Sequence, residues 1–153
     1  MQTPSRTTDV IAAFVIGAAI VATAVLRGDP LYVGIPYYVL AWLVLVGVAQ
    51  IARVPPLFTA GASAALGASV LLYWAWQASL PRPEGMLGLG HVFALPGLAV
   101  GLIAAWFALR RRGPRPVAAF AVAFLACCIG FGIAQLVLCR TGMYCGRLSG
   151  AIG

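Results

Sequence analysis

The sequence predicts an all-α protein: a polytopic bundle of about five transmembrane helices that forms a single integral membrane domain over residues 1–153. Two observations lead to this prediction. The chain is 63% hydrophobic and only 8% charged, whereas soluble domains carry about 25% charged residues. So few charges cannot cover the surface of a protein in water. The apolar residues also fall into long continuous runs, and about 20 such residues cross a bilayer as a helix.

The first two apolar runs are Val10–Leu26 and Ile35–Ile51. Both are near the lower length limit of about 17 residues for a spanning helix. We expect the first run to be retained as a signal anchor, and its cleavage would leave four spans. Tyr37, Tyr38 and Trp42 lie near the start of the second run, and such rings favour the membrane–water interface.

Three further apolar runs follow: Leu57–Leu80, Met86–Leu109 and Val117–Leu138. Pro96 and Gly97 near the middle of the fourth run predict a kink, or a later helix start near His91. All the runs are too long and too continuously apolar for barrel strands of about 10 alternating residues. A helix also satisfies its own backbone hydrogen bonds in lipid. The short connections predict antiparallel neighbours.

The basic residues indicate how the chain is oriented. All ten are arginine, and they lie at the ends of the apolar runs. This distribution is typical of membrane orientation, so the net charge of +7 does not indicate a nucleic-acid groove. The topology determinants form the densest cluster: Arg110, Arg111, Arg112 and Arg115. The positive-inside rule places this cluster on the cytoplasmic side of a bacterial inner membrane. The N-terminus is then cytoplasmic and the C-terminus periplasmic.

Small residues predict where helices approach one another, because burying large apolar side chains drives little association within lipid. Gly61 and Gly67 occupy a small-residue face of the third run, and Gly97 and Gly101 are four residues apart in the fourth. In the fifth run, Gly132 lies four residues after a cysteine. We interpret these positions as packing sites within the chain and not as a dimer interface.

Four cysteines lie near the end of the chain. Cys139 and Cys145 flank a short segment that can turn, and both face an oxidising compartment in the predicted orientation, so a disulfide is expected. Free thiols and metal ligation are the alternatives. Cys127 and Cys128 point about 100° apart on a helix, which makes joint binding of one ion difficult. We interpret this pair as small, polarisable packing residues.

The segment "ACCIG" at residues 126–130 resembles the small bacterial mercuric-ion transport proteins. Those proteins carry a Cys–Cys pair in a transmembrane helix and further cysteines on a loop. The resemblance implies a thiol site at Cys127 and Cys128 that passes on a soft metal ion. In that family the pair lies near the first helix, whereas here it lies in the last apolar run. No acidic or soft-ligand entry site accompanies it.

His91 is the only histidine, and Glu84 lies seven residues before it. The two are a candidate polar site at the outer face, able in principle to move protons or to respond to pH. A histidine bonded to a backbone carbonyl is the alternative. No apolar run has an Asp, Glu or Arg near its centre, whereas ion-coupled transporters usually place such residues at depth. The sequence predicts no catalytic residue, cofactor or metal site.

These observations favour a small bacterial inner-membrane protein without catalytic activity, acting as an accessory, assembly or immunity-type binding subunit. Its expected partners are the lipid bilayer and another membrane or periplasmic protein, and no nucleic acid. The alternative is a small permease or channel component for a neutral or soft-metal solute. A third possibility is a membrane thiol oxidoreductase, although adjacent cysteines lack the CxxC spacing that cycles readily.

Overall fold

The computed structural model describes residues 5–29, 31–79, 86–110 and 115–141. Its helices, in chain order, are α1 (Arg6–Arg27), α2 (Ile35–Ile51), α3 (Phe58–Ser79), α4 (Met86–Arg110) and α5 (Pro116–Thr141). The described residues contain no strand, so the all-α prediction is confirmed. The predicted runs agree with the helices to within a few residues at each end. α4 continues through Pro96, so the alternative start near His91 is wrong.

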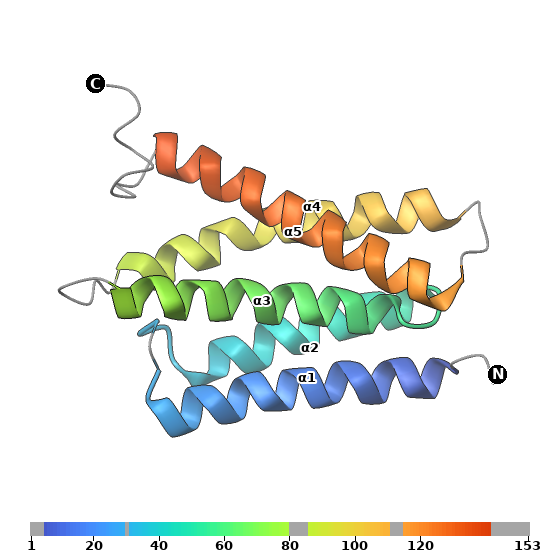
Figure 1. Cartoon of the computed structure of the whole chain (residues 1–153), viewed down its shortest axis with the longest axis horizontal. Helices are drawn as coiled ribbons and strands as arrows, with labels where there is room; N and C mark the ends of the chain where they lie inside the picture. The colour runs from blue at the N-terminus through green and yellow to red at the C-terminus, as the bar shows by residue number, and fades with distance from the viewer. Residues whose placement is uncertain (1–4, 30, 80–85, 111–114, 142–153) are drawn as a thin grey trace.

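Successive helices run antiparallel and form a bundle around α3, and α1 and α5 run parallel to α3 (Figure 1). α3 lies in the middle and contacts each of the other four helices. α1 begins at one end of the bundle, and α5 ends at the other (Figure 1). We call the first of these the basic end, because it carries Arg6, Arg53, Arg110 and Arg115. The opposite end is called the far end.

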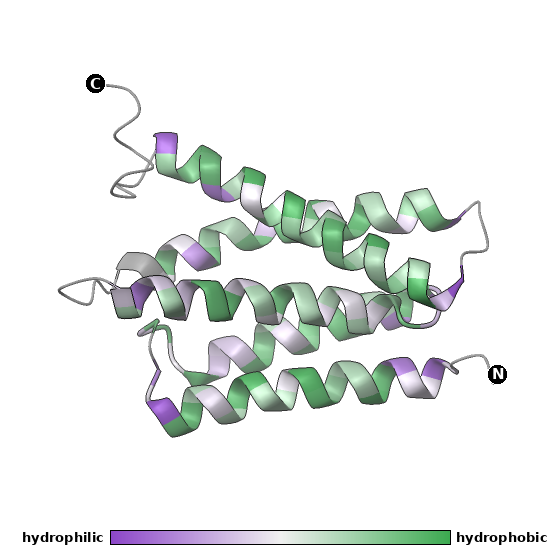
Figure 2. Cartoon of the chain, viewed as in Figure 1, coloured by the Kyte–Doolittle hydropathy of each residue, from purple (hydrophilic) through white to green (hydrophobic). Residues whose placement is uncertain are grey.

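Hydrophobic residues make up most of each helix between the two ends of the bundle (Figure 2). Four helices, namely α1, α3, α4 and α5, are long and apolar enough to cross a membrane. α2 is shorter, at 17 residues, and its rise of about 25 Å is slightly less than the ~30 Å of bilayer hydrocarbon. Exposed apolar side chains such as Phe14 (59%), Val44 (63%) and Ile129 (61%) are what a lipid environment accepts. The chain is therefore a membrane protein with several spans.

The first turn of α3 is capped by a side chain from α1. Both carboxylate oxygens of Asp9 accept hydrogen bonds from the start of α3, one from the amide of Thr59 at 3.2 Å and one from the amide of Ala60 at 2.8 Å. Asp9 is only 2% exposed. A carboxylate at a helix N-terminus satisfies amides that have no partner in the helix and interacts favourably with the helix dipole. Asp9 therefore fixes α1 to α3 at the basic end.

α4 and α5 pack backbone against backbone. A Cβ added at Gly101 would lie 2.7 Å from the carbonyl carbon of Ala126 and 2.9 Å from the Cα of Cys127. One turn earlier, a Cβ at Gly97 would lie 3.0 Å from the carbonyl carbon of Gly130. Contacts this short leave room for glycine alone, so these glycines set the separation of the two helices.

Glycines also mark the contacts of α3. A Cβ at Gly61 would lie 3.0 Å from the Cα of Phe120 in α5, and a Cβ at Gly67 would lie 2.8 Å from the side chain of Ile20 in α1. Gly132 is different, because nothing lies within 4 Å of a Cβ built there. The interpretation of Gly132 as a packing position is therefore wrong. The close approach on α5 is two residues earlier, at Gly130.

Replacing Gly101 by valine is expected to destabilise the bundle by about 1–3 kcal/mol, because the new side chain forces α4 away from α5. Gly132→Val places the same side chain on α5 in open space and serves as the matched control. Thermal unfolding of both variants in detergent micelles checks the prediction. Equal unfolding temperatures for the two variants would show that the α4–α5 separation does not depend on Gly101.

Replacing Asp9 by alanine is expected to cost about 2 kcal/mol or more, because two buried amides lose their acceptor. Asp9→Asn keeps one acceptor oxygen and should cost less. Ser5→Ala is the control, because Ser5 makes the same kind of bond to the amide of Thr8, at 3.2 Å, at the exposed start of α1. Unfolding in micelles ranks the three variants. A loss for Asp9→Ala no larger than that for Ser5→Ala would contradict the capping role.

Candidate functional site

His91 joins three helices through both nitrogens of its ring. The side chain is on α4 and is fully buried. Its Nδ1 lies 2.5 Å from the hydroxyl oxygen of Tyr37 on α2, and its Nε2 lies 3.0 Å from the hydroxyl oxygen of Ser69 on α3. The sequence placed His91 at an outer face, or against a backbone carbonyl. The structure places it inside the bundle, bonded to two side chains.

The hydrogen bonds around His91 determine where its proton lies. The hydroxyl of Ser69 donates to the carbonyl oxygen of Leu66 at 2.7 Å, so this hydroxyl has no second hydrogen to give. Ser69 therefore accepts a hydrogen bond from Nε2–H of His91. Nδ1 then has a free lone pair, which accepts a hydrogen bond from the hydroxyl of Tyr37. The imidazole is neutral, and both of its nitrogens are used within the protein.

A second polar chain lies beside the first and joins α3 to α5. The hydroxyl of Tyr73 donates to Oε1 of Gln135, and Nε2 of Gln135 donates to Sγ of Cys139 at 3.3 Å. The ring centroid of Tyr73 is 4.9 Å from that of His91, nearly edge to face, and Phe131 is 5.2 Å from His91. Aromatic rings thus separate the imidazole from the lipid.

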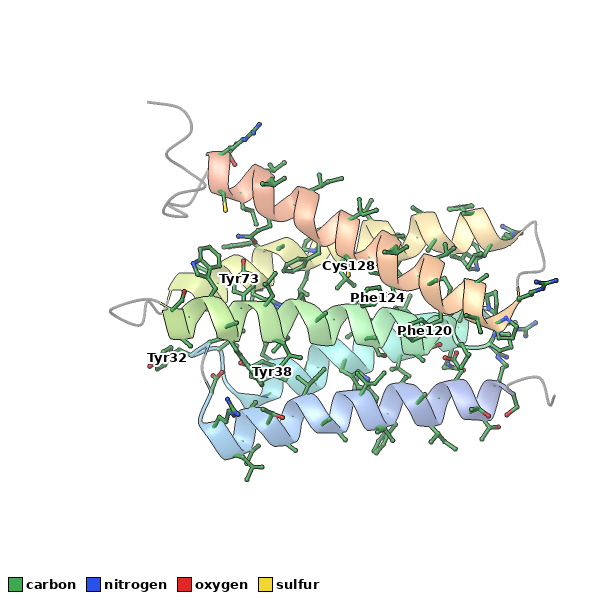
Figure 3. All side chains as sticks on the ribbon, in the orientation of Figure 1. Tyr32, Tyr38, Tyr73, Phe120, Phe124 and Cys128 are labelled. Atoms are coloured by element: carbon green, nitrogen blue, oxygen red, sulfur yellow. The ribbon has the colours of Figure 1, made fainter. Side chains whose placement is uncertain are left out.

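Asp29 organises the connection between α1 and α2 at the far end. Its carboxylate accepts hydrogen bonds from the amides of Leu31, at 3.3 Å, and Gly34. It also accepts a bond of 2.6 Å from the hydroxyl of Tyr38. The Tyr38 ring lies 6.1 Å from that of Trp74 on α3, and Figure 3 shows Tyr38 and Tyr73 toward the same end of the bundle. Asp29 is therefore engaged within the fold.

A cleft opens on the side of the bundle between α2 and α4. The part of the cleft nearest the far end is a hollow of about 420 Å³. Tyr37 bounds this hollow at the far end, and Leu66 of α3 forms its base. The hollow shares Val48, Leu102 and Ile103 with a second hollow of about 190 Å³. The shared lining residues show that these two hollows adjoin each other between α2 and α4.

The cleft continues to the basic end. The second hollow shares Ala52 and Trp106 with a third of about 630 Å³, whose lining includes Arg53 and Arg110. The cleft is thus apolar along the helices and positively charged at one end. Tyr37 connects it to the polar network, because this residue lines the first hollow while its hydroxyl donates to His91.

Cys127 lies in the α4–α5 interface beside Gly101, and neither cysteine lines the cleft. Cys127 is fully buried, Cys128 is half-buried, and both are free thiols. Cys128, Phe124 and Phe120 follow one another along α5 toward the basic end (Figure 3). Among the described residues, no three His, Cys, Asp or Glu side chains lie close enough together to hold a metal ion.

Several predicted residues lie outside the described part of the chain: Glu84, Arg111, Arg112 and Cys145. Cys139 is disulfide-bonded and is buried at the end of α5. Because Cys145 is not described, its pairing with Cys139 stays a prediction. The joint site of His91 and Glu84 is likewise untested. Arg110 and Arg115 both lie at the basic end.

The sequence does not predict the hydrogen-bond partners of Asp9 and His91. The bonds from Asp9 to α3 and from Tyr37 to His91 connect residues 50 or more positions apart. No local pattern indicates such pairs. The one local signal is that Asp9 lies in the first turn of its own helix, α1, where the helix dipole favours a carboxylate.

No protein-family model, curated protein or solved structure matches this chain.

Replacing Tyr37 by phenylalanine is expected to lower stability by about 1–2 kcal/mol, because Nδ1 of the buried His91 loses its donor. Tyr32→Phe is the matched control, since the Tyr32 side chain is 66% exposed. Thermal unfolding in detergent micelles measures the difference. An unchanged unfolding temperature for Tyr37→Phe would show that the bond to His91 contributes nothing.

Proposed function

We propose that this chain is a bacterial inner-membrane protein without catalytic activity that acts as an accessory, assembly or immunity-type binding subunit. We further propose that the cleft between α2 and α4 is its binding site. The observation that carries the proposal is this cleft: it opens sideways from the bundle, is lined by apolar side chains, and is bounded at one end by Arg53 and Arg110. Such a site faces molecules that lie within the bilayer.

The state of the reactive side chains supports binding over chemistry. A general base needs a lone pair directed at the substrate, but both nitrogens of His91 are engaged in hydrogen bonds within the bundle. The carboxylates of Asp9 and Asp29 accept hydrogen bonds from backbone amides. Each of these groups already has a structural role.

The distribution of arginines supports the proposed orientation. Arg6, Arg53, Arg110 and Arg115 lie at the basic end, whereas the described arginines of the far end are Arg27 and Arg140. Cytoplasmic segments carry the excess of basic residues. We therefore propose that the basic end is cytoplasmic. With α2 as a fifth span, the N-terminus is then cytoplasmic and the C-terminus periplasmic.

Photocrosslinking in bacterial membranes tests whether the cleft is a binding site. A benzophenone amino acid at Val44 faces the cleft, and the same residue at Leu125 faces outward from α5; both positions are at least half exposed. We expect a discrete adduct from Val44, and only weak, heterogeneous crosslinking from Leu125. Mass spectrometry of the adduct shows whether it is a lipid or a protein.

Blocking the cleft provides the matched comparison. Ala99 lines the cleft and Ala104 does not, although both are exposed on α4. Ala99→Phe should abolish the Val44 adduct, and Ala104→Phe should leave it intact. Equal crosslinking from Val44 and Leu125, insensitive to Ala99→Phe, would contradict the proposal. Solute uptake by liposomes that contain the purified chain alone would favour the permease instead.

A further inference from the structure

The two ends of the cleft differ in charge. At the basic end, Arg53 and Arg110 line a hollow of about 630 Å³ that has no carboxylate in its lining. The acidic residues that the structure describes, Asp9 and Asp29, are bound to α3 and to the α1–α2 connection. The positive charge at this end of the cleft is therefore not balanced by an acidic group of the lining.

At the mouth of the cleft, contacts restrict the side chain of Arg110 and the backbone of Arg53. The guanidinium carbon of Arg110 lies 5.1 Å from the centre of the Trp106 ring, which is a cation–π contact. The backbone amide of Arg53 donates to the carbonyl oxygen of Gln50 at 3.2 Å, directly before the rigid pair Pro55–Pro56. An anion that binds here meets the Arg110 guanidinium, whose position is already restricted by the Trp106 ring.

The remainder of the cleft suits a hydrocarbon chain. Its lining between Ala52 and Tyr37 is aliphatic or aromatic, and this part of α2 rises about 22 Å. The one polar group near its far end, the hydroxyl of Tyr37, is directed to His91. The middle hollow measures only about 190 Å³, which favours an acyl chain over a helix about 10 Å wide.

We propose that the cleft binds one anionic phospholipid, with its phosphate at Arg53 and Arg110 and an acyl chain lying between α2 and α4 as far as Tyr37. This inference rests on the proposed function of the cleft as a binding site. Arginine pairs with phosphate through charge-assisted, often bidentate hydrogen bonds. The lipid belongs to the leaflet at the basic end. Its headgroup supplies the negative charge that the cleft lacks.

Native mass spectrometry of the purified full-length chain tests the proposal, with equal amounts of phosphatidylglycerol and phosphatidylcholine in the detergent. We expect one phosphatidylglycerol to be retained in preference to phosphatidylcholine by about tenfold, as for a charge-assisted contact. The double variant Arg53→Gln/Arg110→Gln should lose this preference. Ala99→Phe should lower the binding of both lipids, and Ala104→Phe should not.

Arg27→Gln/Arg140→Gln is the matched control, because it removes the same charge from exposed positions at the far end. This control should keep the preference. Unfolding temperatures confirm that every variant is folded. The proposal is overturned if both double variants lose the preference equally, if no preference exists, or if inorganic phosphate displaces the lipid as well as free phosphatidylglycerol does.

The outcomes separate this inference from the proposed function. If the Val44 adduct forms but has the mass of a protein, the cleft remains a binding site and its occupant is a partner helix. If no discrete adduct forms and lipid is retained without preference, both proposals fail. A lipid adduct that is lost in Arg53→Gln/Arg110→Gln supports both.

Discussion

The bilayer offers polar groups no partner, and this constraint governs the whole structure. A hydrogen bond joins every helix of the bundle to at least one other helix. Asp9 joins α1 to α3, His91 joins α4 to α2 and α3, and Gln135 joins α5 to α3. Apolar contacts alone would leave the helices free to slide, because lipid tails solvate leucine as well as another helix does. The polar contacts fix which helices meet and at what height.

These contacts also show that His91, Asp9 and Asp29 are each hydrogen-bonded within the fold. His91 accepts a hydrogen bond from Tyr37 and donates one to Ser69, so its imidazole connects α4 to α2 and α3. The open part of the molecule is elsewhere, where α2 and α4 diverge over Leu66. α3 touches both of them, and no hydrogen bond between described residues connects α2 to α4 except through His91. From Tyr37 toward the basic end, the cleft lies between α2 and α4.

The sequence predicts the helices well, because long apolar runs have few alternatives in lipid: Ile35–Ile51 agrees with α2 at both ends. The sequence does not predict the site, because its parts come from different helices. Nothing near His91 in the chain indicates Tyr37 or Ser69, which lie 54 and 22 positions away. Helical periodicity also cannot distinguish Gly130, which packs against α4, from Gly132, which faces open space. Which face of α5 meets α4 is a property of the assembled bundle.

The capping of α3 by Asp9 has a consequence for biogenesis. Membrane chains are synthesised from the N-terminus, so α1 enters the bilayer before the amides of Thr59 and Ala60 exist to receive its carboxylate. Until α3 arrives, Asp9 must stay in the headgroup region beside Arg6, at the water boundary. Insertion of α3 then supplies the two amides that bind the carboxylate. The capping contact between α1 and α3 therefore forms only after α3 has been synthesised.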